Sequence, residues 1–489
     1  MKNVIRRFPV LLVAAALAGL GACGGSDSSN DNNPPPPPPV TKTVVTNGVI
    51  SGIGSVYVNG ERYGTDDASL TMDDRPGDLL QLKVGQYVEL KGHEHGDGSH
   101  DADVIRYHNV LEGPITSVDA VAGSFVAMGQ TVRVTLDTVF GDDIEPASLA
   151  GLAVDDVVEV SGIVPADGLI DATRIDLKPD GGPYDVSGYV TGVSVAAHRF
   201  NLNALVVDYS AANMEDFTAG DPAVGDLVKV TGSTFLADGA LLALHVELRS
   251  DDYLAAGPGD IVEVEGAIED LVSATDFRVA GWDVTTTADT TYEHGTAADL
   301  ADGVLVMVKG IADADGVLVA HKIAFREVST IRIVAQLDAM SPYGDMELLG
   351  VEASVTDTTV FMDMSALALR EFDFYDLAVG NWLDIRGYED PENPGTVIVT
   401  HVVRIDPATG VRMRGPFRDP VPPSFDILSV LVTTDPYTCF ILEGGKCSDG
   451  MTAAEFFAAA PGQIVEAWGT WNAPALDAAK VEIKVSDDE

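Results

Sequence analysis

A chain of 489 residues is too long for one hydrophobic core and is expected to divide into several domains. It carries 29 Lys and Arg against 76 Asp and Glu, a formal net charge of −47 that repels phosphate backbones and argues against nucleic-acid binding. Hydrophobic residues make up 46% of the chain, enough for packed cores, so disorder does not explain the charge; the acidity fits either solubility or a surface for divalent cations or a basic partner.

Residues 1–22 have the composition of a bacterial lipoprotein signal peptide. A short basic start precedes an apolar run, residues 8–20, that is too short to span a bilayer comfortably but has the length of a signal-peptide core. The run ends in Leu20-Gly21-Ala22-Cys23, which resembles the lipobox. The resemblance implies that Cys23 becomes an acylated N-terminus that anchors the chain to a membrane, and Gly24 favours the outer membrane. The alternative is an ordinary secretory signal with a chance cysteine.

Residues 23–43 read as the acylated cysteine followed by a polar and proline-rich linker. The stretch GGSDSSNDNNPPPPPPV is too polar and too rich in proline to form a packed core. Its six prolines favour polyproline II at about 3.1 Å per residue, which makes a stiff spacer of roughly 19 Å. Such a spacer would hold the folded part away from the membrane.

Six glycines in similar surroundings mark a tandem repeat. They are separated by 70, 70, 78, 77 and 82 residues, and they are Gly92, Gly162, Gly232, Gly310, Gly387 and Gly469. Aliphatic or small residues two and four positions before each glycine alternate with mostly polar ones, which predicts a strand with one buried face. We call these six residues the landmark glycines. Seven positions before each of them, five repeats have another glycine and the second repeat has Asp155, which fits a turn entering the strand.

A hairpin turn and a return strand are expected after each landmark. The turn is clearest at Ala166-Asp167-Gly168. The return strand carries a small residue, a variable pair and an aliphatic residue, as in Ala172-Thr173-Arg174-Ile175 and Thr400-His401-Val402-Val403. Upstream, each repeat opens on a strand and continues in a second hairpin. The predicted repeats are residues 44–109, 110–180, 181–252, 253–328, 329–408 and 409–489.

Each repeat thus contains about five short strands, with one helical turn before the fourth. So many strands in 60–80 residues must close or cover their edges, and a five-stranded barrel of OB-like type does so. The sequence therefore predicts an all-β protein, a tandem array of about six small OB-like barrels. Small β-sandwiches are the alternative.

The repeat resembles the bacterial repeat known as domain of unknown function family 5666, which occurs in tandem in exported lipoproteins. The likeness is carried by Leu152–Gly162 with Ala172–Ile175, by the opening segment Gly113–Asp119, and by Phe125 leading into Asp137–Phe140. It extends from about residue 45 to residue 489 and is strongest in the second repeat. The resemblance implies export and a β-rich domain, and it brings no catalytic residues to carry over.

Two cysteines lie close together near the end of the chain. Cys439 and Cys447 are best interpreted as one disulfide that closes a short loop in an exported protein. A metal pair or two free thiols are the alternatives.

The sharpest polar cluster is His93-Glu94-His95-Gly96-Asp97-Gly98-Ser99-His100 in the first repeat. Alignment with the second repeat places Asp97-Gly98 on the hairpin turn, with His93 and His95 on one side of the outgoing strand and His100 at the start of the return strand. Three imidazoles so placed can converge on one ion, and imidazole suits zinc, nickel or copper. The spacing matches no known metal motif, and a solvated hairpin tip is the alternative. No other cofactor is expected.

Other polar patterns are explained by strands and turns. His245, His321 and His401 fall on the variable pair of three return strands, which indicates exposed strand positions. Asp313-Ala314-Asp315-Gly316 is typical of a hairpin turn, because no ligands follow at EF-hand spacing. The sequence has no Gly-x-Ser-x-Gly, His-Glu-x-x-His or phosphate-cradling motif. A Ser/His/Asp set assembled from distant residues stays open.

These patterns predict a lipid-anchored outer-membrane protein of the cell envelope that is not an enzyme, on either the periplasmic face or the cell surface. Its array of β-domains would bind or hold an unknown envelope protein or glycan. One alternative is a metal-binding lipoprotein that uses the hairpin of the first repeat. Another is an extracellular enzyme that acts on polysaccharide through carboxylate pairs.

Overall fold

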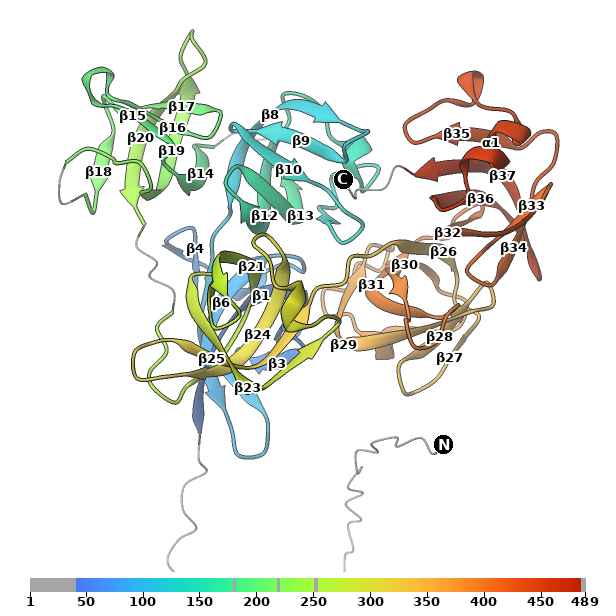
Figure 1. Ribbon diagram of the computed structural model, residues 1–489, viewed down its shortest axis with the longest axis horizontal. Coiled ribbons are helices and arrows are strands. Elements are labelled where there is room, and N and C mark those ends of the chain that lie inside the picture. Colours follow the sequence, from blue (N-terminus) through green and yellow to red (C-terminus); the bar gives the residue numbers. More distant parts are fainter. Residues whose placement is uncertain (1–40, 179–181, 218–219, 250–253, 485–489) are drawn as a thin grey trace, which may run out of the picture. The chain divides into compact units, whose positions relative to one another are not determined.

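The computed structural model describes residues 41–178, 182–217, 220–249 and 254–484. Within these ranges the strands form six five-stranded barrels, one for each predicted repeat, with one pairing scheme (Figure 1). In every barrel the first strand pairs antiparallel with the fourth, and the fourth with the fifth. The third strand pairs antiparallel with the second and parallel with the fifth. The second strand pairs antiparallel with the first strand, or with a short strand that continues it, and this closes the barrel. The scheme is that of an OB-type barrel, and the predicted fold class is confirmed. Some barrels have more than five labelled strands because short additional segments, most of which continue the first or the third strand, are labelled separately.

The first two barrels are drawn in blue and cyan in Figure 1. Barrel 1 consists of β1 (Lys42–Gly52), β2 (Val56–Val58), β3 (Glu61–Gly64), β4 (Ser69–Met72), β5 (Arg75–Pro76), the 3-10 turn η1 (Leu79–Gln81), β6 (Tyr87–Glu94) and β7 (His100–Tyr107). Barrel 2 consists of β8 (Leu111–Asp119), β9 (Ser124–Ala127), β10 (Gln130–Arg133), β11 (Val139–Phe140), η2 (Leu149–Gly151), β12 (Val157–Ala166) and β13 (Leu169–Leu177).

The next two barrels are green and yellow. Barrel 3 consists of β14 (Tyr184–Tyr189), β15 (Gly192–Ser194), η3 (Val195–Ala197), β16 (Arg199–Leu202), β17 (Leu205–Asp208), β18 (Asn213–Glu215), β19 (Leu227–Phe235) and β20 (Leu241–Leu248). Barrel 4 consists of β21 (Ile261–Ser273), β22 (Asp276–Val279), β23 (Trp282–Glu293), η4 (Ala297–Asp299), β24 (Leu305–Ala312) and β25 (Leu318–Phe325).

The last two barrels are orange and red. Barrel 5 consists of β26 (Ile331–Gln336), β27 (Ala339–Met340), β28 (Asp345–Leu348), β29 (Val351–Asp363), η5 (Phe374–Asp376), β30 (Trp382–Glu389) and β31 (Val397–Ile405). Barrel 6 consists of β32 (Val411–Val421), β33 (Ser424–Ile427), β34 (Val430–Thr433), β35 (Cys439–Leu442), η6 (Cys447–Asp449), α1 (Ala453–Ala459), β36 (Ile464–Asn472) and β37 (Ala475–Lys484). The helical turn expected before the fourth strand is most developed here, as α1.

A β-bulge opposite each landmark glycine explains why the residue recurs. The register between fourth and fifth strands shifts by one residue just before every one of the six glycines. The extra residue pushes a backbone carbonyl toward the fourth strand. A Cβ at any of the six positions would lie only 1.9 to 2.7 Å from that carbonyl oxygen. Glycine is therefore required by the close approach of two backbones.

The turn that enters the fourth strand has the backbone conformation that the sequence predicts. Gly85, Gly225, Gly303, Gly380 and Gly462 have φ between 83° and 95°. Asp155, which replaces glycine in the second repeat, has φ of 76°. Glycine adopts such angles without strain and Asp tolerates them better than most residues. The same turn with positive φ therefore recurs in all six barrels.

In four barrels the second strand contributes a buried phenylalanine to the core. Phe125, Phe200, Phe277 and Phe425 occupy the same place in four second strands and are at most 2% exposed. An aromatic ring buries a large apolar area. Each therefore anchors the interior of its barrel.

First strands join the barrels into three pairs. β1 pairs parallel with β21, β8 pairs antiparallel with β14, and β26 pairs antiparallel with β32. Barrels 1 and 4, 2 and 3, and 5 and 6 therefore share continuous sheets. The buried side chains follow this pairing, because barrels 2 and 3 share one hydrophobic cluster and barrels 5 and 6 share another.

The predicted leader and linker lie outside the described residues, apart from their last three positions, 41–43. Cys23 and the apolar run 8–20 are therefore not seen. Among the residues that the structure does describe, no helix has the length and apolar composition needed to cross a membrane.

Candidate functional site

Barrels 1, 2, 4 and 5 meet around a cavity of about 370 Å³. Its lining includes Val49 from barrel 1, Thr173 from barrel 2, Arg326 from the end of barrel 4, and Tyr388 and His401 from barrel 5. A mixed polar and apolar lining of this kind is typical of a ligand or contact site between domains. The polar cluster on one wall is the candidate functional site.

A turn in the third strand of barrel 2 presents Asp137 to this wall. The hydroxyl of Thr138 accepts a hydrogen bond from the backbone N–H of Thr135 (3.0 Å) and donates one to the carbonyl of Ala172 (2.8 Å). The hydroxyl of Thr135 accepts from the backbone N–H of Asp137 (3.1 Å). Because these local bonds hold the turn on its own barrel, the Asp137 carboxylate is free to contact another one.

The same turn recurs in three other barrels. In each, a threonine hydroxyl donates to a carbonyl of the fifth strand, at 2.7 to 2.8 Å: Thr290 to Ala320, Thr359 to Val399 and Thr438 to Ala478. The position equivalent to Asp137 in barrel 4 is Asp289, which is exposed. The turn is therefore a property of the repeat, whereas the contact made by Asp137 belongs to barrel 2.

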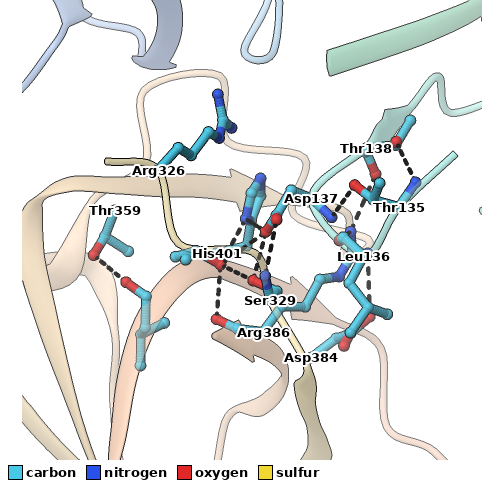
Figure 2. Close-up of polar contacts among 12 residues, drawn as sticks. Thr135, Leu136, Asp137, Thr138, Arg326, Ser329, Thr359, Asp384, Arg386 and His401 are labelled. Carbon is cyan, nitrogen blue, oxygen red and sulfur yellow. Dashed lines mark hydrogen bonds and ion pairs between the residues drawn. The ribbon is translucent and has the colours of Figure 1, made fainter. Parts of the chain in front are cut away.

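Asp137 is bound by the segment that links barrels 4 and 5 and by the return strand of barrel 5 (Figure 2). Its carboxylate accepts hydrogen bonds from the Ser329 hydroxyl (2.5 Å) and backbone N–H (3.1 Å) and from the Thr400 hydroxyl (3.1 Å). His401 Nδ1 lies 3.3 Å from the same carboxylate. Ser329 and His401 are 4% exposed. Ser329 and His401 are therefore withdrawn from water, whereas Asp137 and Thr400 keep part of their surface exposed.

Arg386 makes a second contact between the same two barrels. Its guanidinium donates to the backbone carbonyls of Leu136 (2.6 Å) and Thr138 (3.1 Å), on either side of Asp137 (Figure 2). Asp384 lies behind it at 3.5 Å. A charged donor to two buried carbonyls makes strong hydrogen bonds. Side chain and backbone of one turn are thus both bound by barrel 5.

Asp137 is the charged member of the cluster. Burial alone would raise the pKa of its carboxyl, but hydrogen bonds from His401 and Ser329 and the nearby charge of Arg326 outweigh burial and hold that pKa well below its ordinary value. Burial lowers the pKa of His401 although Asp137 opposes the change, so the ring is neutral at neutral pH. An ionised carboxylate therefore faces neutral donors.

The cluster contains Ser329, His401 and Asp137, but not in the order that nucleophilic catalysis needs. In a hydrolytic triad the imidazole contacts the hydroxyl and takes its proton. Here the carboxylate lies between them, with the Ser329 hydroxyl donating to Asp137 and sharing a 2.6 Å contact with Thr400. Among the described residues no hydrogen bond joins Ser329 to His401. In this arrangement the three groups connect barrel 2 to barrel 5 and to the segment that precedes it.

The histidine hairpin of barrel 1 has the predicted turn but does not assemble three ligands. β6 and β7 flank the turn, with φ of 84° at Gly98. His93 lies 3.1 Å from Asp103, His95 lies 2.8 Å from Asp101, and His100 lies 3.8 Å from Glu61. Across the described part of the chain, no group of three or more His, Cys, Asp or Glu side chains is arranged to hold a metal ion. Separate carboxylates face the three imidazoles, so they do not converge.

The return-strand prediction for barrel 5 was one residue out of register. His401 pairs with Arg386 and Val399 pairs with Gly387, so Thr400 is the bulged residue. His401 is therefore equivalent to Arg174 and to His245. It is buried by the contact with barrel 2 and is not an exposed strand position. His321 falls on the bulge of barrel 4 and is exposed.

Two further sequence predictions concern side chains in turns and loops. Cys439 and Cys447 are joined by a disulfide, with 5.6 Å between their Cα atoms. Asp313 accepts hydrogen bonds from the backbone N–H groups of Asp315 and Val317, both at 2.9 Å. The Asp313 carboxylate is thus used by the hairpin turn itself.

The contact between barrels 1 and 3 is expected to weaken in acid. His108 lies 3.2 Å from Arg249 and 3.7 Å from Asp74, which also binds Lys229 at 2.9 Å. Burial, helped by the charges of Arg249 and Lys229, lowers the pKa of His108 to about 4 although Asp74 opposes the change. The unfolded chain, with its histidine pKa near 6.5, then binds more protons. Stability from this group is complete above pH 6.5 and is lost toward pH 4, by at most about 3 kcal/mol.

Replacing His108 with glutamine removes this proton uptake. The protection of backbone amides in β7 and β20 against hydrogen exchange should therefore rise in His108→Gln relative to the wild type as the pH falls from 7 to 4.5. Exposed His321→Gln is the control, with a difference that does not change over this range. A constant difference for His108→Gln would contradict the assignment.

The pairing scheme defines the class of this protein as a tandem array of five-stranded OB-type barrels joined through their first strands and polar junctions. A family model described as Domain of unknown function (DUF5666) matches residues 44–106, 112–176, 187–247, 265–324 and 333–402. The chain therefore belongs to this family, as a protein of tandem repeats. Barrel 6 lies beyond the last matched range, yet it has the same strand pairing. No curated protein matches the chain.

Proposed function

We propose that this protein is a non-enzymatic, lipid-anchored scaffold of the cell envelope, held at the outer membrane, that binds an envelope protein or a glycan. The observation that carries the proposal is the junction at Asp137. A serine, an imidazole and a carboxylate could form a hydrolytic site. At this junction the three groups instead make contacts that hold two barrels together.

Further junctions support a scaffold that fixes its barrels against one another. Arg174 of barrel 2 donates to the Val84 carbonyl of barrel 1 at 2.9 Å, and Tyr87 N–H donates to the Ser161 hydroxyl at 2.8 Å. Arg370 of barrel 5 donates to two carbonyls of barrel 1, those of Leu79 and Leu82, at 2.9 and 3.1 Å. Contacts between barrels that are distant in sequence favour a defined arrangement over barrels that move independently of one another.

The sequence supports the anchor. A signal-peptide core that ends in a lipobox-like cysteine, followed by a proline-rich spacer, is what a tethered array requires. The acidity of the array would favour a partner that carries positive charge.

The anchor is tested at Cys23. Wild-type cells fed radioactive palmitate should label the chain and keep it in the membrane fraction. The Cys23→Ser chain should lose the label and leave the membrane fraction, because its acyl chains are its only expected anchor. The Cys447→Ser chain is the control and should keep both. Label retained in Cys23→Ser would contradict the lipid anchor.

The non-enzymatic assignment is tested by assaying the purified chain for conversion of substrates. Ester, peptide and polysaccharide substrates should be unchanged by the purified chain, and Ser329→Ala and His401→Ala should behave as the wild type does. A reaction that is lost in either variant would overturn the non-enzymatic assignment and favour the polysaccharide-acting alternative.

A further inference from the structure

The sheet shared by barrels 5 and 6 carries arginines on three adjacent strands of its outward face. Ile331 and Ile333 of β26 face the core and are at most 1% exposed, so Arg332 between them faces outward. The register places Arg332 opposite Arg386 of β30 on one side and opposite Arg414 of β32 on the other. These strands lie side by side in Figure 1.

Only part of this positive charge is compensated. Side chains directly opposite on neighbouring strands are about 4.5–5.5 Å apart at Cβ, where like charges repel. Asp384 forms a bidentate salt bridge with Arg332, with hydrogen bonds of 2.6 and 2.7 Å, and lies 3.5 Å from Arg386. The two arginines lower the pKa of Asp384 to about 2, against the effect of burial, which alone would raise it. One carboxylate thus serves two arginines. Arg386 is also bound to the Leu136 and Thr138 carbonyls of barrel 2 and is only 7% exposed, so the accessible part of this face lies around Arg414.

Arg414 is the arginine of this face that has no acidic partner among the described residues. Its half-buried side chain makes no hydrogen bond or ion pair with any described residue, and its Nε is buried without a partner. Glu466 lies directly opposite Arg414 in the register of β32 and β36, but its carboxylate is bound by Arg412 and lies 3.5 Å from Lys484. Burying part of a guanidinium without an acceptor costs stability. The fold therefore leaves a donor group ready for an anion.

The surroundings of Arg414 are basic in a strongly acidic protein. The arginine patch consists of Arg332, Arg386, Arg412, Arg414, Lys480 and Lys484, with Asp384, Glu443, Glu466 and Glu482 as its carboxylates. Asp137 of barrel 2 adds its negative charge beside Arg386, so six cations face five acids, where the whole chain has 29 cations against 76 acids. Because the distant acidic charges are screened beyond about 8 Å in physiological salt, nearby charges decide binding here.

We propose that the arginine patch binds an oxyanion, a phosphate, sulfate or carboxylate group, with Arg414 as its main ligand and Arg332 beside it. A guanidinium offers a planar fork of donors that matches such groups. Trp468 borders the site, with Arg412 4.9 Å and Lys480 4.2 Å from its ring centre. The site goes beyond the proposed scaffold and does not depend on the lipid anchor.

The test is a calorimetric titration of the full-length chain, in neutral detergent, with inorganic phosphate. The wild type should give a saturable heat, and Arg414→Gln should weaken binding by about tenfold or more. Exposed Arg75→Gln, a matched loss of charge in barrel 1, should bind as the wild type does. Trp468→Phe should keep the heat and lose the fluorescence change that accompanies it. No saturable heat with phosphate, sulfate or acetate overturns the proposal, as does wild-type affinity in Arg414→Gln.

If Arg414→Gln does not fold, Arg414→Lys takes its place in the titration. It keeps the charge and loses the fork, so affinity should fall by about threefold or more while the circular dichroism spectrum stays unchanged. Unchanged affinity overturns the proposal. Sedimentation of Cys23→Ser protein with phosphatidylglycerol or phosphatidylcholine vesicles then separates the sources. Binding to the anionic vesicles that depends on Arg414 identifies a lipid headgroup, and binding of phosphate alone identifies a soluble or polymer-borne anion.

Discussion

Replacing Asp137 with alanine is expected to release barrel 2 from barrel 5. The carboxylate accepts hydrogen bonds from the Ser329 hydroxyl and N–H and from the Thr400 hydroxyl, and it faces the buried His401. Its loss leaves several buried donors without an acceptor and removes the negative charge near Arg326. We expect a cost of about 3–5 kcal/mol, which is typical of breaking a buried charged pair from one side.

The release is measured by hydrogen exchange and by protease cleavage in residues 326–330, which connect barrels 4 and 5. A cost of 3 kcal/mol corresponds to an increase of roughly a hundredfold in the open population, so both should accelerate strongly. Local probes are needed because an array of barrels does not unfold in one step.

Asp289→Ala provides a matched control. Asp289 occupies the same turn in barrel 4 and is exposed, and its backbone N–H is bonded to Thr287 just as that of Asp137 is to Thr135. Asp289→Ala should therefore leave exchange and cleavage unchanged. Equal effects of the two substitutions would show that the turn matters and the junction does not.

The barrels could be predicted because their requirements are local and repeated six times. The alternation before Gly162 records a strand with one buried face, and the positive φ at Gly85 and Asp155 reflects a turn that few residue types adopt. The bulge opposite Gly162 could not be predicted, because it depends on which residues of two strands are paired. The same limit produced the register error at His401, where the longer hairpin of barrel 5 hides the extra residue.

The junctions could not be predicted, because they join parts of the chain that no local pattern connects. Asp137 stood out only as part of a segment that resembles the family, and Ser329 lies 192 residues away in a linker. The recurrent threonine that holds the turn, Thr138 with its equivalents, was the available signal. At the histidine hairpin, the acids Asp101 and Asp103 were visible in the sequence, and their pairing with the imidazoles depends on the strand register.

A second large effect is expected at the glycine opposite the bulge. In barrel 3, a methyl group on Gly232 would lie 2.7 Å from the Leu242 carbonyl oxygen and 3.0 Å from the Leu241 side chain. Because atoms do not pack this closely, β19 and β20 must move apart, at the cost of about 1–3 kcal/mol that overpacking usually brings. Gly188, in β14 of the same barrel, has open space where its Cβ would be and is the matched control.

Hydrogen exchange within β19 and β20 should accelerate by about tenfold or more in Gly232→Ala. In Gly188→Ala it should stay the same or slow slightly, since alanine restricts the unfolded chain more than glycine does. The double variant Gly232→Ala, Leu241→Ala separates the two contacts. Because Leu241 is fully buried, the double variant is compared with Leu241→Ala alone. Trimming Leu241 relieves the side-chain overlap and leaves the carbonyl in place, so Gly232→Ala should lower protection at the bulge in this background too. Equal protection in the double variant and in Leu241→Ala would mean that core packing, and not the backbone, requires glycine at this position of barrel 3.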